Sequence, residues 1–295
     1  MELMLDYNFN LELTQLSGQT SQPPWDCEDN IFKEVVLVYG KPVLFKVSND
    51  SFSYEMPLNA DFAVNEKTVF KKFHDIYDLD FDLEKFYSYL EEDKNLKNAK
   101  DFCNGLRLFI AKDPFECIIS SICSANNSIK RWTKSVSDIK EKIGTGYEFP
   151  SGTYYTFPSS ETLMNTPEEV LKSCGVGYRA PYMTGASELF TLEMDLSDFN
   201  KMDYDEAFKT ILEVPGVGPK VADCILLYGF RFNEAFPSDV WIKRIVSHLY
   251  FDSKDISVPK VRSFGRDEFG DYAGYVQLYL FHYARRSGLM SQLKK

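Results

Sequence analysis

Lys220 lies where a lysine could act as a nucleophile. It follows the string Val214-Pro215-Gly216-Val217-Gly218-Pro219, which separates two segments whose apolar residues have helical spacing. Two glycines let the chain turn tightly and leave backbone N–H groups uncovered, and such groups at the N-terminus of a helix attract anions. A phosphate group of a nucleic acid fits that description. The string therefore predicts an anion-binding turn directly before Lys220.

A lysine amine attacks carbon only when it is neutral. A site that buries Lys220 or places it near another cation would lower its pKa and activate it. Asp239 is the second residue of interest, because it precedes the helical run Val240 to Leu249 in the way an N-cap does. A carboxylate held there stays ionised, and could stabilise a developing positive charge or help to move the proton of the lysine. The simpler interpretations are a solvated lysine after an ordinary turn and a plain N-cap.

The sequence predicts a scaffold of mixed type around these residues. Between Val35 and Asn59, short apolar runs alternate with turn residues at 40–42 and 49–50, which is typical of antiparallel strands. From about Leu83 onward the apolar spacing predicts helices, two of them at about 204–212 and 219–228 around the glycine string. Residues 144–160, rich in Gly, Pro, Ser, Thr and Tyr, are predicted to form a long surface loop.

We therefore expect the α+β class. Residues 1–98 are predicted to form an N-terminal lobe with an antiparallel β-sheet and a flanking helix. Residues 99–295 are predicted to form a mostly α-helical body that contains a helix-hairpin-helix motif at about 204–228.

Composition limits the classes of function. With 295 residues, 44% of them hydrophobic and 26% charged, the chain is neither disordered nor a bare coiled coil. No apolar run approaches the roughly 18 residues of a membrane span, and the first ten residues lack the order of a signal peptide. The six cysteines are scattered, without a Cys-x-x-Cys pair, so we expect reduced thiols and no zinc or iron–sulfur site. An intracellular protein without a membrane partner is expected, placed in the cytoplasm or nucleoid if bacterial.

The net charge of -11 argues at first against a nucleic-acid partner. The first 100 residues hold 19 acidic and 10 basic side chains, whereas the remaining 195 hold 25 and 23. Because the acid is concentrated at the front, the later part of the chain can still present a local basic strip to a polyanion.

The string Gly216-Val217-Gly218-Pro219-Lys220-Val221-Ala222-Asp223-Cys224, with Asp239 downstream, resembles the helix-hairpin-helix (HhH-GPD) DNA glycosylase superfamily. Within it the string is similar to the 8-oxoguanine DNA glycosylase/AP lyase family. Segments at 17–19, 113–127, 175–180 and 272–277 agree with the same family, and the resemblance runs from about residue 12 to about residue 285. It implies an enzyme that flips 8-oxoguanine out of duplex DNA, excises it through a lysine Schiff base and cleaves the strand at the abasic site by β-elimination.

The resemblance assigns Lys220 and Asp239 to catalysis. The base pocket that it implies has a Cys and a Phe that sandwich the flipped base, a Gln that bonds its Watson–Crick edge, and a Gly carbonyl that distinguishes the lesion from guanine at N7. These match Cys224, Phe281, Gln277 and Gly18.

The resemblance also implies contacts to DNA. Residues that fill the vacated stack and contact the estranged cytosine match Asn126, Arg131, Tyr178 and Arg179, and the phosphate-binding hairpin matches Gly216, Val217 and Gly218. As in family hairpins, the carbonyls of Leu212, Val214 and Val217 are expected to be able to hold a structural monovalent cation, and no cofactor is required. The expected partner is double-stranded DNA containing 8-oxoguanine, and the expected state is a monomer.

Two departures from the family pattern bear on the pocket rim and on the preference for the opposite base. Trp241 stands where the best-known eukaryotic members carry a phosphate-contacting His. Residues 20–25 replace the continuation of the family's usual GQxFRW string.

Three alternatives remain open from the sequence. One is a superfamily glycosylase of different base specificity, although no four-Cys iron–sulfur loop is present and an alkylbase glycosylase lacks the lysine. Another is a non-catalytic hairpin module that binds DNA, which leaves Lys220, Asp239 and Gln277 unexplained. The last is a scaffold whose acidic front binds a basic protein.

Overall fold

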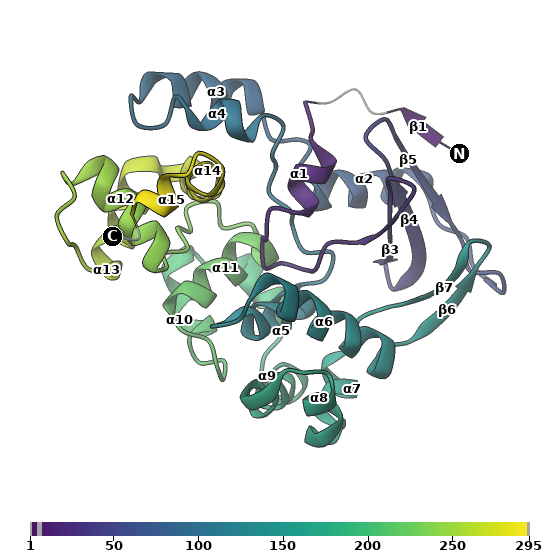
Figure 1. Cartoon of the computed structure of the whole chain (residues 1–295). Coiled ribbons are helices and arrows are strands. Elements are labelled where there is room, and N and C mark those ends of the chain that lie inside the picture. Colours follow the sequence, from purple (N-terminus) through teal and green to yellow (C-terminus); the bar gives the residue numbers. More distant parts are fainter. Residues whose placement is uncertain (1, 5–7, 294–295) are drawn as a thin grey trace.

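The chain combines one antiparallel sheet with a larger helical body (Figure 1). The computed structural model describes residues 2–4 and 8–293. The sheet has five strands in the order β1-β5-β4-β3-β2, and every neighbouring pair is antiparallel. Its strands are β1 (Glu2–Met4), β2 (Asp26–Glu28), β3 (Ile31–Val38), β4 (Lys41–Val47) and β5 (Ser51–Glu55). The predicted α+β class is confirmed, and the outer strands β1 and β2 are additions to the prediction.

The β3–β4 hairpin turns one residue earlier than predicted. Tyr39 and Gly40 have φ angles of 50° and 76°, the left-handed pair of a two-residue hairpin turn whose twist matches that of the strands. Pro42 lies inside the sheet, paired with Leu37.

Aromatic side chains cover one face of the sheet. Phe52 on β5 stacks on Phe73 of helix α2 (Glu66–Ile76) with ring centres 4.2 Å apart. Tyr77 stacks in turn on Phe109, with ring centres 5.4 Å apart, and Trp25 packs against both rings. These side chains form the core of the N-terminal lobe.

The other face of the sheet packs against a second hairpin, formed by β6 (Gly146–Phe149) and β7 (Gly152–Tyr155). Phe149 joins Val35 and Leu44 of the sheet in a small buried cluster. The prediction of a surface loop is therefore wrong for these strands. The turn residues in this segment flank two short aromatic runs, and aromatic side chains favour strands when one face can be buried.

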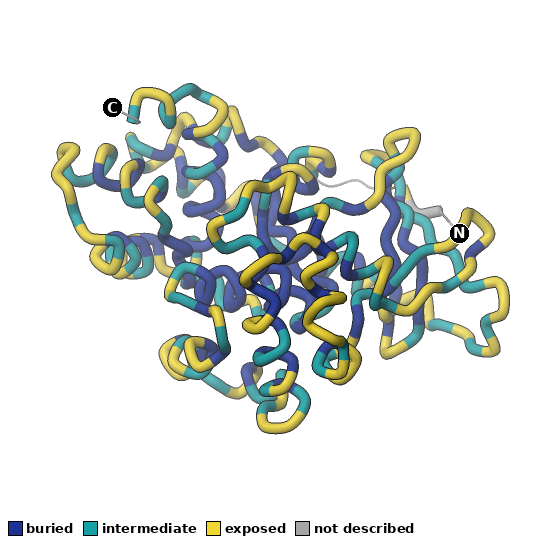
Figure 2. The backbone as a smooth tube through the Cα atoms, turned by 60° about the horizontal axis from the view of Figure 1, so that its bottom comes forward, coloured by how far each residue is buried: buried dark blue, intermediate teal, exposed yellow. Residues whose placement is uncertain are grey.

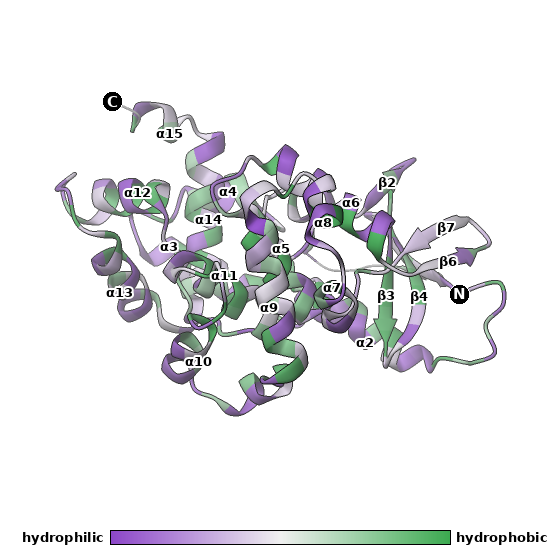
Figure 3. Ribbon diagram, turned by 90° about the horizontal axis from the view of Figure 1, so that it is seen from below, coloured by the Kyte–Doolittle hydropathy of each residue, from purple (hydrophilic) through white to green (hydrophobic). Residues whose placement is uncertain are grey.

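The helical body surrounds helix α5, whose side chains are almost all buried. Its other long helices include α9, α11 and α14, and Figure 2 shows the buried backbone running through the middle of the molecule. In Figure 3, β3, β4 and α11 are mostly hydrophobic, whereas the peripheral α13 is mostly hydrophilic. The helices outside the sheet lobe are α3 (Leu83–Glu92), α4 (Ala99–Cys103), α5 (Pro114–Ser124), α6 (Ile129–Ile143), α7 (Ser160–Met164), α8 (Glu168–Ser173), α9 (Ala180–Leu192), α10 (Tyr204–Ile211), α11 (Pro219–Phe230), α12 (Val240–Tyr250), α13 (Val258–Phe269), α14 (Ala273–Arg286) and α15 (Leu289–Gln292). The short helix α1 (Leu11–Gln15) belongs to the N-terminal part.

A buried connecting segment, residues 105–111, runs between the sheet lobe and the body. The Ile110 N–H donates to the Ile76 carbonyl of α2 at 2.8 Å, and the Ala111 N–H donates to the Tyr228 carbonyl of α11 at 2.9 Å. Its backbone polar groups are thus bonded to both parts of the molecule, as burial requires. The division of the chain between residues 98 and 99 stays a prediction.

Helices α10 and α11 form the predicted hairpin. A capping box between Asp203 and Glu206 begins α10, and Gly218 is the N-cap of α11 with Pro219 at its first position. Within residues 2–4 and 8–293, no helix is long and apolar enough to cross a membrane.

Candidate active site

Six residues singled out in the sequence line one pocket. They come from four separate segments: the loop after α1, the first turns of α11, the start of α12, and α14. The pocket is lined by Ser17, Gly18, Gln19, Thr20, Lys220, Cys224, Tyr228, Pro237, Asp239, Gln277, Leu278 and Phe281. The fold therefore brings the predicted catalytic pair and the predicted base pocket together.

Lys220 lies partly buried in the first turn of α11. Burial lowers its pKa, but the hydrogen bond and charge interaction with Cys224 and the nearby carboxylates of Asp239 and Asp223 raise it by more. Its pKa therefore lies above the ordinary lysine value, and the amine is protonated in the free protein. The condition for activation considered from the sequence, a pKa lowered by burial or by a nearby cation, is therefore not met in the free protein.

Asp239 is the N-cap of α12, as predicted. Its Oδ1 accepts the backbone N–H groups of Trp241 and Ile242, both at 2.9 Å. One carboxylate oxygen thus holds the helix start while the side chain also lines the pocket beside Lys220. The two roles considered for this residue are geometrically compatible.

Gln277 and Phe281 lie one turn apart on α14 and face the same pocket. Gln277 is 8% exposed, and no side-chain hydrogen bond joins its amide to another described residue, although its amide atoms are not among the fully buried unpaired ones. Because this amide is not used inside the protein and faces the pocket, it can offer both a donor and an acceptor to a ligand there. Cys224 and Phe281 add a sulfur and an aromatic face to the pocket.

The Gly18 loop is fixed from behind by its neighbour Gln19. The Gln19 amide donates to the Arg107 carbonyl at 3.0 Å and accepts from the Phe109 N–H at 2.8 Å. Gly18 has a φ of 84°, and a Cβ there would lie 2.9 Å from Ile129 Cδ1, so glycine is required. The loop is therefore held by the buried connecting segment.

Residues 20–25, which differ from the family pattern, lie mostly in the protein interior. Gln22 donates to the Ile110 carbonyl at 2.9 Å, and the Ser120 hydroxyl donates to the Thr20 carbonyl, also at 2.9 Å. Trp25 is 2% exposed in the core of the sheet lobe. Only Thr20 of this segment lines the pocket. Most of the residues that differ from the family pattern here therefore pack in the interior and do not contact the pocket.

Asn126 projects from the turn between α5 and α6 with a left-handed φ of 50°. It is exposed and lines a second, wider depression that also includes Lys220, Asp239, Trp241 and Phe281. Asn126 therefore lies in the wider depression into which the pocket opens.

Arg179 differs from its expected position. It is 6% exposed and donates to the carbonyls of Ala125, Asn126 and Val176. In this conformation it holds the turn that presents Asn126 and does not extend toward a partner base. The neighbouring Tyr178 is 58% exposed, with the Arg179 guanidinium 4.5 Å from its ring centre.

Arg131 lies in the first turn of α6, and its side chain is exposed. Its backbone N–H donates to the Ser128 hydroxyl at 3.3 Å, which caps the helix. The side chain is not among those that line either depression, so the structure places it near the site without bringing it into the pocket.

The hairpin offers open backbone groups. Among the described residues, the N–H groups of Gly216 and Gly218 have no hydrogen-bond acceptor, whereas Val217 donates to the Val214 carbonyl at 3.1 Å. A Cβ on Gly216 would lie 2.8 Å from Tyr182, while one on Gly218 would meet open space. The hairpin therefore fits the predicted anion-binding turn.

Of the three carbonyls predicted to hold a monovalent cation, those of Leu212 and Val217 accept no hydrogen bond from the described part of the chain, whereas that of Val214 accepts from the Val217 N–H. The cation site stays a prediction. The same residues do not provide a conventional metal centre. No group of three or more His, Cys, Asp or Glu side chains within residues 2–4 and 8–293 could hold a metal ion.

The sequence analysis missed Tyr228 and Thr20 as pocket residues. Tyr228 could have been found from periodicity, because it lies four residues after Cys224 on the helix that carries Lys220. It also missed Asp223, a fully buried carboxylate bonded to Tyr204 and to Arg262 Nε, the latter at 2.7 Å. The signal was a single acidic residue inside an apolar helix.

Comparison with known protein families identifies both parts of the chain. Residues 3–118 match the N-terminal domain of 8-oxoguanine DNA glycosylase, and residues 119–267 match the HhH-GPD superfamily of base excision DNA repair proteins. The chain belongs to the 8-oxoguanine DNA glycosylase family. This membership confirms the resemblance seen in the sequence and makes the chain an enzyme of the N-glycosylase/DNA lyase class.

One relative of this glycosylase family matches nearly the whole chain, and another matches a little more than half of it. A probable N-glycosylase/DNA lyase of Methanothermobacter thermautotrophicus is 47% identical over 98% of this chain and 97% of its own length. The N-glycosylase/DNA lyase OGG1 of Arabidopsis thaliana is 33% identical, over 58% of this chain and 50% of its own length.

Solved structures of family members have the same fold. MBOgg1 in complex with a low-affinity DNA ligand gives a TM-score of 0.84 at 32% identity, covering 97% of this chain and 96% of that chain. The Clostridium acetobutylicum 8-oxoguanine glycosylase/lyase, bound to double-stranded DNA with cytosine opposite 8-oxoguanine, gives 0.81 at 30% identity, covering 98% of each chain. Both of these relatives were solved with DNA.

Proposed function

We propose that this glycosylase excises 8-oxoguanine from duplex DNA through a Schiff base on Lys220 and then nicks the strand. The observation that supports this most is the common pocket of Lys220, Cys224, Asp239, Gln277 and Phe281. A nucleophile and an unpartnered amide share one cavity, as a reaction at C1′ of a base held by its edge requires.

In the proposed reaction, the neutral Lys220 amine attacks C1′ of the lesion nucleotide and the bond from C1′ to the base breaks. The bonding electron pair leaves with the base, and the sugar ring opens to give an imine between C1′ and the lysine nitrogen. The nitrogen gives up two protons in these steps, one taken up by the departing base and one by the ring oxygen O4′. Loss of a proton from C2′ then expels the 3′ phosphate by β-elimination. This sequence accounts for both a glycosylase and a lyase activity.

Lys220 must first lose the proton that its surroundings stabilise. Asp239 faces the same pocket and raises the pKa of the lysine, so it also stabilises positive charge that develops on the sugar. Entry of DNA excludes water and brings the hairpin amides against a phosphate. We propose Asp239 as the electrostatic partner of the reaction and Gly216–Gly218 as the backbone clamp.

The base pocket suits a purine with an altered N7. The Gln277 amide can donate to and accept from a Watson–Crick edge, with Phe281 and Cys224 stacking on the two faces. The Gly18 carbonyl, held by the Gln19 contacts, would accept the N7–H of 8-oxoguanine and repel the lone pair of guanine. We propose that Asn126, which lines the wider depression, and the exposed Tyr178 fill the vacated stack.

Borohydride trapping tests the proposal. Reduction of the imine should join the protein covalently to a duplex with 8-oxoguanine opposite cytosine and not to an undamaged duplex. Lys220→Gln should abolish the adduct and the nick while DNA binding remains. Lys209→Gln, an exposed lysine on the neighbouring helix α10, is the matched control and should trap normally.

Other outcomes of the trapping experiment would favour one of the alternative functions. Trapping confined to a different damaged base would replace the proposed substrate within the same superfamily. Binding without release of any base or any adduct would favour the non-catalytic hairpin module. Nicking that survives in Lys220→Gln would remove Lys220 from the mechanism.

A further inference from the structure

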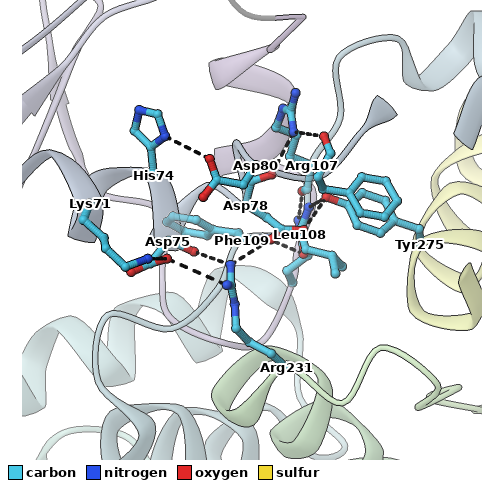
Figure 4. A network of polar contacts seen from close by, with 12 residues as sticks. Lys71, His74, Asp75, Asp78, Asp80, Arg107, Leu108, Phe109, Arg231 and Tyr275 are labelled. Atoms are coloured by element: carbon cyan, nitrogen blue, oxygen red, sulfur yellow. Dashed lines mark hydrogen bonds and ion pairs between the residues drawn. The ribbon is translucent and has the colours of Figure 1, made fainter. Parts of the chain in front are cut away.

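One carboxylate in the N-terminal part of the chain contacts both helices that line the base pocket (Figure 4). Asp78 lies between α2 and α3, with its side chain 14% exposed. Its Oδ1 accepts from Arg231 Nη2 at 2.7 Å, and its Oδ2 accepts from the Tyr275 hydroxyl at 2.8 Å. Its two oxygens thus serve two different helices.

Arg231 fixes the end of the lysine helix. It is the C-cap of α11, with a left-handed φ of 62° and ψ of 32°. Besides the Asp78 carboxylate, its Nη2 contacts the Asp75 carbonyl at 3.1 Å. A non-glycine residue in this backbone region is strained unless its surroundings hold it, and these contacts to the α2 end supply that restraint. Lys220 and Cys224 lie on the same helix.

Tyr275 fixes the glutamine helix in a similar way. It is 1% exposed in the first turn of α14, two residues before Gln277. Its ring stacks on Phe81 with centres 3.8 Å apart, and its hydroxyl accepts the Leu108 N–H at 3.3 Å while donating to Asp78. The hydroxyl therefore has a defined donor and acceptor, and its direction is set.

The loop that carries Asp78 is also connected, through Arg107, to the Gly18 loop, which forms a third side of the pocket. Arg107 Nη1 donates to the Asp78 carbonyl at 2.7 Å and to the Phe81 carbonyl at 3.1 Å. The carbonyl of Arg107 accepts from the Gln19 amide, the neighbour of Gly18. The helix that carries Lys220, the helix that carries Gln277 and the Gly18 loop are thus all connected by hydrogen bonds to the same loop around Asp78.

We propose that Asp78 is a positioning residue for excision, which sets the separation of α11 and α14 and hence of Lys220 and Gln277. This inference rests on the proposed function, because it concerns the pocket that holds the flipped base. Excision needs the nucleophile and the base pocket in register, whereas β-elimination at a preformed abasic site needs the nucleophile alone. Loss of the hydrogen bonds of Asp78 to Arg231 and Tyr275 therefore slows excision and spares β-elimination at a preformed abasic site.

Asp78→Asn tests the link with little change in volume. The amide is neutral and can accept at only one position, so either Arg231 or Tyr275 loses its acceptor. We expect single-turnover release of 8-oxoguanine to slow by between about tenfold and a hundredfold. Cleavage of a preformed abasic duplex should change by less than about threefold, with DNA affinity and melting temperature close to those of the unaltered protein.

Asp80→Asn is the matched control, because Asp80 lies in the same loop, is 76% exposed and pairs with His74 at 3.3 Å. It should behave as the unaltered protein in both assays. Tyr275→Phe is the second variant, since it keeps the stacked ring and removes only the hydroxyl. It should reproduce the split between excision and abasic cleavage even if Asp78→Asn is poorly folded.

Equal losses of excision and abasic cleavage in both variants, or no loss in either, would overturn the positioning role. Failure of the proposed function looks different, because the unaltered protein would then release no 8-oxoguanine at all. The unaltered protein measured beside the variants separates the two failures.

Discussion

The Cys224 thiol lies one helical turn beyond Lys220 on α11 and hydrogen-bonds its amine. With the nearby carboxylates, this contact raises the pKa of the lysine although burial lowers it. A nucleophile that is protonated at rest gains its reactive neutral form as the pH rises. In the reaction proposed above, loss of the Lys220 proton is therefore a step that controls the rate.

Cys224→Ala should shift the pH dependence of strand cleavage toward lower pH. The substitution removes a group that raises the pKa of Lys220, so the neutral amine is populated at a lower pH. The measurement is the pH–rate profile of β-elimination on a preformed abasic duplex. Because this substrate has no damaged base, the loss of a contact between the base and the sulfur cannot affect the rate. Cys174→Ala, in a buried position beyond α8, is the control, and a profile that does not move in Cys224→Ala would contradict the assignment.

Gly216→Ala should destabilise the protein through the hairpin. The φ of 82° disfavours any side chain, and the added Cβ would lie 2.8 Å from Tyr182. We expect the free energy of unfolding in urea to fall by about 1–3 kcal/mol. Gly218→Ala, where a Cβ would meet open space, should lose at most about 1 kcal/mol as a weaker N-cap. Equal losses in the two variants would show that the Tyr182 contact is unimportant.

The hairpin, its lysine and the Asp239 cap could be predicted because their signals are local. Pro219 and the glycines mark a helix start within a few residues, and Asp239 stands directly before an apolar helical run. The β6–β7 hairpin was missed because its strands are stabilised by the distant Val35 and Leu44. The turn residues around it were then the stronger signal.

Lys112→Met should leave a buried acid without its partner. Lys112 Nζ lies 2.5 Å from Glu116, whose side chain is 1% exposed, and 3.8 Å from Glu34 on β3. Removing one member of a buried pair typically costs about 3–5 kcal/mol, because the remaining charge stays desolvated. The free energy of unfolding at neutral pH measures this loss. The double variant Lys112→Met/Glu116→Leu should recover much of it, and a further loss there would contradict the explanation.

His282 should make the protein sensitive to mild acid. Burial, with the charges of Arg286 and Arg285, lowers the pKa of its imidazole to about 4, and both ring nitrogens are buried without a partner in the described chain. In the unfolded state the His282 imidazole binds a proton near pH 6.5, whereas in the folded state it stays neutral. The folded protein therefore keeps its full stability above that pH and loses stability as the pH falls toward 4.

The expected size of this loss is about 3 kcal/mol. Unfolding free energies of the unaltered protein and of His282→Gln, compared at pH 7 and pH 4, measure it. The difference between the two proteins should shrink or reverse in acid. A constant difference between the two pH values would exclude His282 as the titrating group.

The pocket residues could be named from the sequence only through the family resemblance, and their surroundings could not. Asp78, Tyr275 and Arg231 are distant in sequence and ordinary in type, so no spacing rule connects them. The protonation of Lys220 likewise depends on Asp239, which is brought to it by a different helix. Local patterns predict elements, whereas the electrostatics of a site depend on which elements meet.

Gly18 and Phe281 face the same cavity from near the two ends of the chain. During synthesis, the loop that holds Gly18 leaves the ribosome well before α14. Closing so long a stretch of chain is slow compared with forming the local hairpin. A nascent chain that ends before α14 therefore lacks one wall of this cavity, even where the local α10–α11 turn has already formed.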